Sequence, residues 1–214
     1  MKKFYNDYLD SVIKPERSLF IGIVFLVVVI SGVFGWVYEY IFYWINGGFD
    51  KFYWRGGNFL PWINIYAYGS LMIWFLTFTF KLRRKPLLVF IISFVSTGIL
   101  EFFSGLGVYL ITGLKYWDYD TEILGFGSIY GFVCLRSVTV FGVFGLILIY
   151  VMLPAVYYLA VKLPKKVFLV TAVILFVVFL GDDIYNLVFA HLFSLPGAPD
   201  VYSSIGFNFM DYTR

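Results

Sequence analysis

The sequence predicts an all-α integral membrane protein, a bundle of about five transmembrane helices. Hydrophobic residues make up 61% of the 214 residues and charged residues 14%, whereas soluble domains contain roughly 45–50% and 25%. The mean hydropathy is +0.86. Uncharged runs at 18–38, 56–80 and 137–161 are each long enough to cross a bilayer, which takes about 20 residues. Two further spans, 86–113 and 167–193, qualify if the acidic residues within them are tolerated.

The five predicted spans form one transmembrane domain, residues 19–193, between two tails. Residues 1–18 form a cytoplasmic tail, in which residues 3–13 place apolar side chains on one helical face. This pattern is typical of a short helix at the membrane surface, and a disordered tail is the alternative. Residues 194–214 form an extracytoplasmic tail.

The positive charges predict the orientation in the membrane. Eleven of the sixteen Lys and Arg residues lie in the N-terminal tail and in two connections, 81–85 and 162–166. Five spans place these three regions on one side, which is cytoplasmic by the positive-inside rule. We therefore expect a multi-pass protein of the cell membrane, surrounded by lipid, with its N-terminus cytoplasmic and its C-terminus outside. Basic clusters so explained predict no nucleic-acid partner.

Acidic residues inside two predicted spans indicate a functional site. Glu101 and Asp182 each lie 16 residues beyond the last lysine of the preceding basic cluster, so both should lie at one depth, in the outer half of the bilayer. An ionised carboxylate in hydrocarbon costs several kcal/mol and usually faces a protein interior or a water-filled cavity. Gly98 and Gly105 share a helical face with Glu101, which therefore points toward a packing partner.

Other polar residues are expected at the same depth. Glu39 shares a face with Gly32 and Gly35 at the outer end of the first span, and residues 114–136 form an irregular connection. Within it, residues 123–135 are uncharged but too short to cross, as in a re-entrant or interfacial segment. The predicted substrate- or ion-binding residues are Glu39, Glu101, Trp117, Asp118, Tyr119, Arg136, Asp182, Asp183, Tyr185 and Asn186.

Three chemical roles are open for the predicted acidic layer. Its four carboxylates, from Glu39, Glu101, Asp182 and Asp183, could bind a divalent cation, which prefers oxygen ligands. They could instead carry protons, or pair with Arg136 and tie helices together. Catalytic residues and any cofactor beyond such a cation are not identified by the pattern. The lone Cys134 is expected to be a small buried residue, and the sequence contains no nucleotide-binding motif.

Several motifs in order resemble one known family. A Gly-Trp-x-x-Glu ends the first span, a Pro-x-x-x-Tyr-x-x-Gly-like stretch opens the second, and Leu-Glu-x-x-x-Gly lies in the third. Trp-Asp-Tyr, Gly-x-x-Cys-Leu and an Asp in the last span follow. The matching residues are Gly35, Trp36, Glu39, Pro61, Tyr66, Gly69, Leu100, Glu101, Gly105, Trp117, Asp118, Tyr119, Gly131, Cys134, Leu135, and Asp182 or Asp183.

These motifs resemble the Putative ABC-transporter type IV family, small polytopic bacterial membrane proteins with vertebrate relatives. The chain departs from the family at Phe132, where the family often carries a basic residue, and Arg136 is a candidate substitute. The resemblance implies a permease-like transporter or channel subunit. Because the chain has no ATPase motif, it would need a separate ATPase subunit or a homo-oligomer.

Two alternatives to a transporter are open from the sequence. One is an intramembrane enzyme that acts on lipid or prenyl-linked substrates from the outer leaflet, so the question of catalysis is not decided. The other is an assembly or sensor subunit, in which the acidic layer is structural. A transporter predicts a path to both membrane faces, an enzyme a cavity open to lipid or to the outside, and an assembly subunit direct pairing of the carboxylates.

Overall fold

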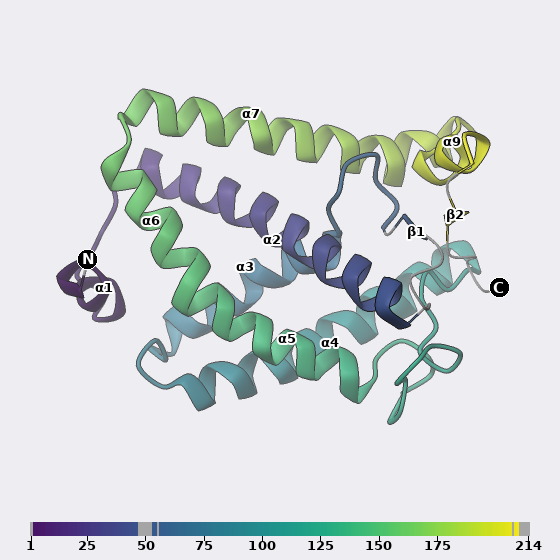
Figure 1. Cartoon of the computed structure of the whole chain (residues 1–214), viewed down its shortest axis with the longest axis horizontal. Helices are drawn as coiled ribbons and strands as arrows, with labels where there is room; N and C mark the ends of the chain where they lie inside the picture. Colours follow the sequence, from purple (N-terminus) through teal and green to yellow (C-terminus); the bar gives the residue numbers. More distant parts are fainter. Residues whose placement is uncertain (1, 47–52, 55, 207, 210–214) are drawn as a thin grey trace. The chain divides into compact units, whose positions relative to one another are not determined.

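The computed structural model describes residues 2–46, 53–54, 56–206 and 208–209 (Figure 1). The regular secondary structure of these residues is helical apart from two short strands, β1 (Tyr53–Trp54) and β2 (Asn208–Phe209), which pair in parallel. The predicted all-α class is therefore confirmed. The chain divides into two compact units. Among the described residues, unit 1 comprises those within 2–14 and 69–155, and unit 2 comprises those within 15–68 and 156–209.

Four helical stretches among the described residues are long and apolar enough to cross a membrane, so the chain is a membrane protein. They match the predicted first, third, fourth and fifth spans. The elements that form them are α2 (Arg17–Asn46), α4 (Pro86–Thr112), α5 (Leu135–Ile147) with η1 (Leu148–Met152) and α6 (Leu153–Lys162), and α7 (Lys165–Ile184) with η2 (Tyr185–Phe189) and α8 (Ala190–Leu192). Both η1 and η2 are π-helical.

The second predicted span, residues 56–80, is not confirmed as a crossing helix. The helix there, α3 (Asn64–Thr79), has 16 residues and is about 24 Å long, which is less than the roughly 30 Å of hydrocarbon. Residues 56–63 are not helical, because Gly56 adopts a left-handed φ of 76° and Pro61 interrupts helical hydrogen bonding. The count of five spans and the re-entrant segment therefore remain predictions.

In unit 1, glycines allow α4 and α5 to pack closely. A Cβ atom built on Gly98 would lie 2.8 Å from a Val138 methyl group, and one on Gly142 would lie 2.5 Å from the Phe90 ring. A larger residue would therefore push the helices apart. The structure confirms that the glycine-bearing face of α4 is a packing face, as expected for helices in a membrane.

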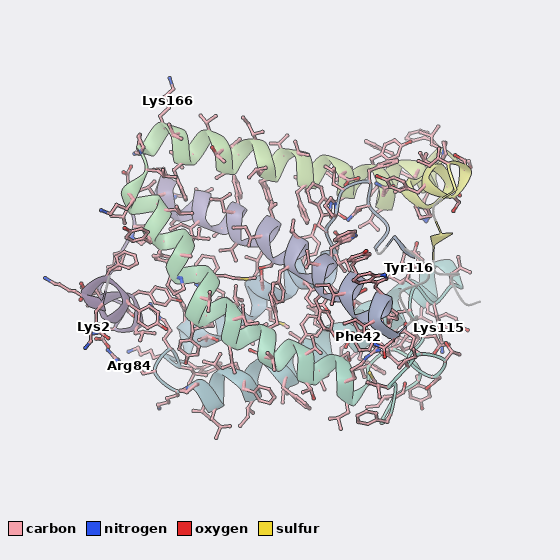
Figure 2. All side chains as sticks on the ribbon, in the orientation of Figure 1. Lys2, Phe42, Arg84, Lys115, Tyr116 and Lys166 are labelled. Atoms are coloured by element: carbon pink, nitrogen blue, oxygen red, sulfur yellow. The ribbon has the colours of Figure 1, made fainter. Side chains whose placement is uncertain are left out.

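The N-terminal tail contains a helix, α1 (Lys2–Leu9), which packs within unit 1. Its expected place at the membrane surface stays a prediction. The Tyr8 side chain is fully buried, and its hydroxyl donates to the Ile149 carbonyl at 2.9 Å. The buried Arg83 guanidinium donates to the Tyr8 carbonyl and lies 3.7 Å from the Phe78 ring centroid. Figure 2 shows Lys2 and Arg84 at this end of unit 1 and Lys115 at the other end.

In unit 2, α2 lies beside α7 (Figure 1), again through glycines. A Cβ atom on Gly22 would lie 2.8 Å from the Phe168 ring, and one on Gly35 would lie 2.2 Å from Tyr66 Cγ in α3. The chain after α8 continues into α9 (Ala198–Ser204), where the buried Ala198 begins the helix. Unit 2 therefore surrounds the C-terminal end of α7 with α2, the start of α3 and the segment before it.

Replacing Gly35 by alanine should destabilise the protein, whereas replacing Gly181 should not. The new Cβ atom at Gly35 would meet Cβ and Cγ of Tyr66, which cannot swing away as the end of a flexible side chain could. Such overpacking typically costs about 1–3 kcal/mol. Gly181 in α7 has nothing within 4 Å, so alanine there keeps or improves stability through its better helix propensity. Thermal unfolding in detergent measures both, and equal unfolding temperatures would contradict the close contact.

Candidate functional site

Glu101 is buried in unit 1 and held by two hydroxyl groups. Its side chain is 2% exposed. The Tyr119 hydroxyl donates to Oε1 at 2.6 Å, and the Ser137 hydroxyl donates to Oε2 at 2.7 Å. Tyr119 comes from the α4–α5 loop, residues 113–134, and Ser137 comes from the first turn of α5. The acid on α4 thus joins three segments of unit 1.

A helix cap fixes the Ser137 hydroxyl beside Glu101. Cys134 is the N-cap of α5, and its Sγ accepts from the Ser137 N–H at 3.4 Å. In return, the Cys134 N–H donates to Ser137 Oγ at 3.2 Å. This reciprocal pair is a capping box, which satisfies donors at the helix start. The predicted burial of Cys134 is confirmed, and its position explains how the sequence Cys-Leu-Arg-Ser places a hydroxyl at this point.

The hydroxyl pair around Glu101 can accommodate the carboxyl group in either protonation state. Ser137 has one hydroxyl hydrogen and two acceptors within reach, Glu101 Oε2 and the Cys134 carbonyl at 2.9 Å. When Glu101 is ionised, this hydrogen goes to the carboxylate. When Glu101 is protonated, the acid can donate to Ser137 Oγ while the hydroxyl turns to the Cys134 carbonyl, because a hydroxyl both donates and accepts. No heavy atom has to move between the two states.

The α4–α5 loop positions the Tyr119 hydroxyl. Trp117 donates from Nε1 to the Phe132 carbonyl at 2.8 Å, and Asp118 pairs with Lys115 at 3.0 Å. Both contacts are internal to the loop. Arg136 lies over the Tyr119 ring, 5.2 Å from its centroid, and pairs with Glu122 at 2.9 Å. Of the Trp-Asp-Tyr motif, Tyr119 contacts the buried acid, whereas its two neighbours fold the loop.

In unit 2, Asp182 accepts hydrogen bonds from N–H groups. The backbone N–H groups of Phe59 and Leu60 donate to Oδ1 and Oδ2 at 3.0 and 2.9 Å. The Asn186 side-chain amide donates to Oδ1 at 2.8 Å. Because an N–H group only donates, a proton on Asp182 would displace one of these bonds. These contacts tie the non-helical segment before α3 to α7.

Asp183 has different partners, since it is turned about 100° from Asp182 around the helix. Its side chain is 4% exposed. The Asn64 side-chain amide donates to Oδ1, and the Tyr68 hydroxyl donates to Oδ2. Both donors lie in the first turns of α3, whose N-terminus favours a negative charge. The Tyr68 hydroxyl can also accept, so Asp183, like Glu101, can be accommodated with or without a proton.

The two aspartates lie between two irregular backbone segments. Residues 56–63, which are not helical, contact Asp182 through Phe59 and Leu60. The π-helical η2 begins at Tyr185, directly after α7, and π-helical turns occur frequently at functional sites. Non-helical backbone at membrane depth occurs where it is buried in protein or lines a polar cavity. The backbone on both sides of the aspartate pair is therefore irregular.

The structure brings together only some of the predicted site residues. Unit 1 groups Glu101, Tyr119 and Arg136, and unit 2 groups Asp182, Asp183 and Asn186. Tyr185 instead donates to the Pro196 carbonyl at 3.1 Å, and Glu39 is partly buried on α2. A single acidic layer across both units remains a prediction. The described residues contain no group of three or more His, Cys, Asp or Glu side chains that could hold a metal ion.

Sequence reasoning missed three side chains that contact the buried acids. Asn64 and Tyr68 are spaced by four residues, so they share one helical face in an otherwise apolar stretch. This shared polar face was the sequence signal that could have identified them as partners of a buried acid. Ser137 follows Cys134 at the spacing of a capping box, which indicated a helix start but not its contact with Glu101. No local pattern could reveal the backbone donors at Phe59 and Leu60.

A comparison with protein families identifies one match. The family model described as Putative ABC-transporter type IV matches residues 19–187, which includes nearly all of α2, all of α3 to α7 and both carboxylate sites. No curated protein and no solved structure matches the chain.

Asparagine should be tolerated at Asp183 but not at Asp182. In Asp183→Asn, the amide oxygen can still accept from Asn64 and the amide N–H can donate to Tyr68 Oη. In Asp182→Asn, a new N–H group would face backbone N–H groups, and an unsatisfied buried donor costs about 1–3 kcal/mol. Thermal unfolding in detergent should show a clear loss of stability for Asp182→Asn alone. A larger loss for Asp183→Asn would contradict the assigned partners.

Proposed function

Because the chain belongs to the Putative ABC-transporter type IV family, we propose that it is a permease-like transporter or channel subunit with a proton-binding acidic site in the outer half of the bilayer. The observation that carries the proposal is the bonding of Asp183. This nearly buried carboxyl group on a candidate span has neutral hydrogen-bond partners within the described residues, Asn64 and Tyr68.

The neutral partners favour a working site over a structural one. A carboxylate that only ties helices together needs an ionised partner or fixed donors to offset the cost of its burial. Asp182 has such fixed donors, whereas Asp183 and Glu101 contact hydroxyl groups that can reverse their role. In this proposal Asp182 holds the site together, while Glu101 and Asp183 bind and release protons.

The break before α3 supports transport in particular. Membrane transporters commonly bind ions and substrates where a helix is discontinuous, because its free backbone groups and its partial charges face the site. Here the non-helical residues 56–63 and the first turn of α3 both contact the aspartate pair. A polar substrate or cation bound at this point would meet backbone groups as well as carboxylates.

Contacts within each unit support the proposed orientation. In unit 1, Asp10 pairs with Arg84 at 2.6 Å, and in unit 2, Glu16 pairs with Lys165 at 2.7 Å. Each contact joins the N-terminal segment to one of the basic connections, 81–85 or 162–166. A common side for these three regions places the N-terminus in the cytoplasm. Because the sequence has no nucleotide-binding motif, an ATP-driven cycle would require a separate ATPase subunit.

Proton binding should produce a charge displacement in proteoliposomes after a rapid step from alkaline to acidic buffer. Measured on a solid-supported membrane, the wild-type protein should give a transient current. The double variant Glu101→Gln and Asp183→Asn should lose most of this current, because amides do not titrate. Both amides can keep the hydrogen bonds of the acids they replace, so we expect the double variant to remain folded.

Asp120→Asn is the matched control, since Asp120 is an exposed acid of the α4–α5 loop. This variant should keep the wild-type current. An undiminished current in a folded double variant would overturn the assignment of the proton sites. A wild-type protein without any current, at full incorporation and stability, would favour an assembly or sensor role.

A further inference from the structure

The α4–α5 loop has its charged residues inside and its apolar residues outside. Glu122 and Arg136 pair at 2.9 Å, with side chains only 6% and 10% exposed. Lys115 and Asp118 form a second, largely shielded pair. In contrast, five large apolar or aromatic side chains are between 47% and 75% exposed, namely Ile123, Leu124, Phe126, Ile129 and Tyr130. A loop in water has the reverse arrangement.

Hydrogen bonds within the loop hold this arrangement in place. The Tyr119 N–H donates to the Gly131 carbonyl and the Ile129 N–H to the Val133 carbonyl, each at 2.9 Å. The Arg136 guanidinium donates to the Ile123 carbonyl at 2.6 Å. The exposed side chains therefore project from an ordered backbone, and they cannot simply turn inward.

Two of the exposed side chains are kept at a cost in backbone energy. Leu124 and Tyr130 have left-handed φ angles of 57° and 55°. A residue with a Cβ atom is strained in this conformation, which glycine adopts freely. Glycine occupies the other left-handed positions of the α4–α5 loop, namely Gly113, Gly127 and Gly131. The outward leucine and tyrosine side chains are therefore expected to contribute something that glycine cannot.

We propose that the face formed by Leu124, Phe126, Ile129 and Tyr130 is inserted into the lipid of the adjacent leaflet. The candidate spans on either side end at Ile111 and begin at Leu135, so the loop lies at the membrane boundary. Leu110, Ile111 and Leu135, at the adjoining ends of α4 and α5, are also exposed. The Leu135 N–H donates to the Phe126 carbonyl at 3.2 Å, so the apolar face of the loop adjoins the exposed start of α5. Insertion at the boundary between headgroups and acyl chains stabilises such apolar faces.

Lipid fits this face better than a water-soluble partner would. The two internal ion pairs leave the face without exposed charge, whereas Asp120 and Thr121 are exposed on another part of the loop and suit water. The aromatic side chains of Tyr116, Trp117 and Tyr119 are typical of a membrane–water interface. The inserted loop carries Tyr119, which donates to Glu101, but the proposal does not depend on proton binding there.

Site-directed spin labelling of the full chain in lipid nanodiscs tests the insertion. Cys134→Ser provides a cysteine-free background, because serine is a strong helix cap. Single labels replace Phe126 or Tyr130, and labels at Asp120 and Thr121 are the matched controls on the same loop. Power saturation then compares accessibility to oxygen, which concentrates in lipid, with accessibility to a water-soluble nickel chelate. We expect an oxygen-to-nickel ratio several-fold higher at positions 126 and 130 than at positions 120 and 121.

Either of two other outcomes would overturn the proposal. Strong nickel accessibility at positions 126 and 130 would place the face in water. Low accessibility to both reagents would show that protein covers it, through a second copy or another partner. The unlabelled wild-type protein provides an independent readout in liposomes that contain a diazirine-bearing acyl chain. Photolysis should attach lipid within residues 123–130 but not at Asp120 or Thr121, and the absence of such adducts would contradict the insertion.

Discussion

A carboxyl group buried in a membrane protein must have donors for its oxygens, because hydrocarbon supplies none. In this chain many of those donors come from outside the regular helices. Glu101 receives one from the α4–α5 loop, and Asp182 receives two from the backbone before α3. The irregular segments are thus folded around the acids. The buried carboxyl groups need the donors of these segments, and the segments in turn depend on the carboxyl groups for their hydrogen bonds.

The glycines of α4 serve this requirement as well as helix packing. A Cβ atom on Gly105 would lie 2.9 Å from the Phe132 ring and 3.0 Å from the Trp117 ring, both in the α4–α5 loop. Gly98, two turns earlier, admits Val138 of α5. One face of α4 therefore packs against α5 at Gly98 and against the α4–α5 loop at Gly105. Glu101 lies between these two glycines on the helix. The loop comes close enough for Tyr119 to reach the carboxylate because that level of the helix carries no side chain.

Hydropathy and helical periodicity are local properties, which is why the five spans predicted from the sequence include the four that the structure describes. The same local patterns predicted the glycine face of α4 and the burial of Glu101. The other features, such as the start of α3 and the partners of each aspartate, depend on contacts between residues that are distant in sequence. The start of α3 depends on the backbone held by Asp182, and the π-helical turns have no signature in composition. Asp182 and Asp183 look alike in sequence, yet they differ because each faces other donors. Arg136 was a candidate partner for Glu101 or Asp182, whereas the structure pairs it with Glu122 from a loop expected at the outer surface.

The docking of α1 has a practical consequence for handling the protein. Its Tyr8 side chain is fully buried, and the hydroxyls of Tyr5 and Tyr8 donate to carbonyl groups within η1. The N-terminal residues, which would ordinarily be removed as a tail, thus pack against the helix where its hydrogen bonding changes from α to π. An affinity tag or fluorescent fusion joined directly to this end would follow the exposed Lys2 and Lys3, within two helical turns of Tyr5 and Tyr8. A flexible spacer between the affinity tag and α1 avoids this crowding. Purification then does not favour molecules in which α1 has detached from its contacts.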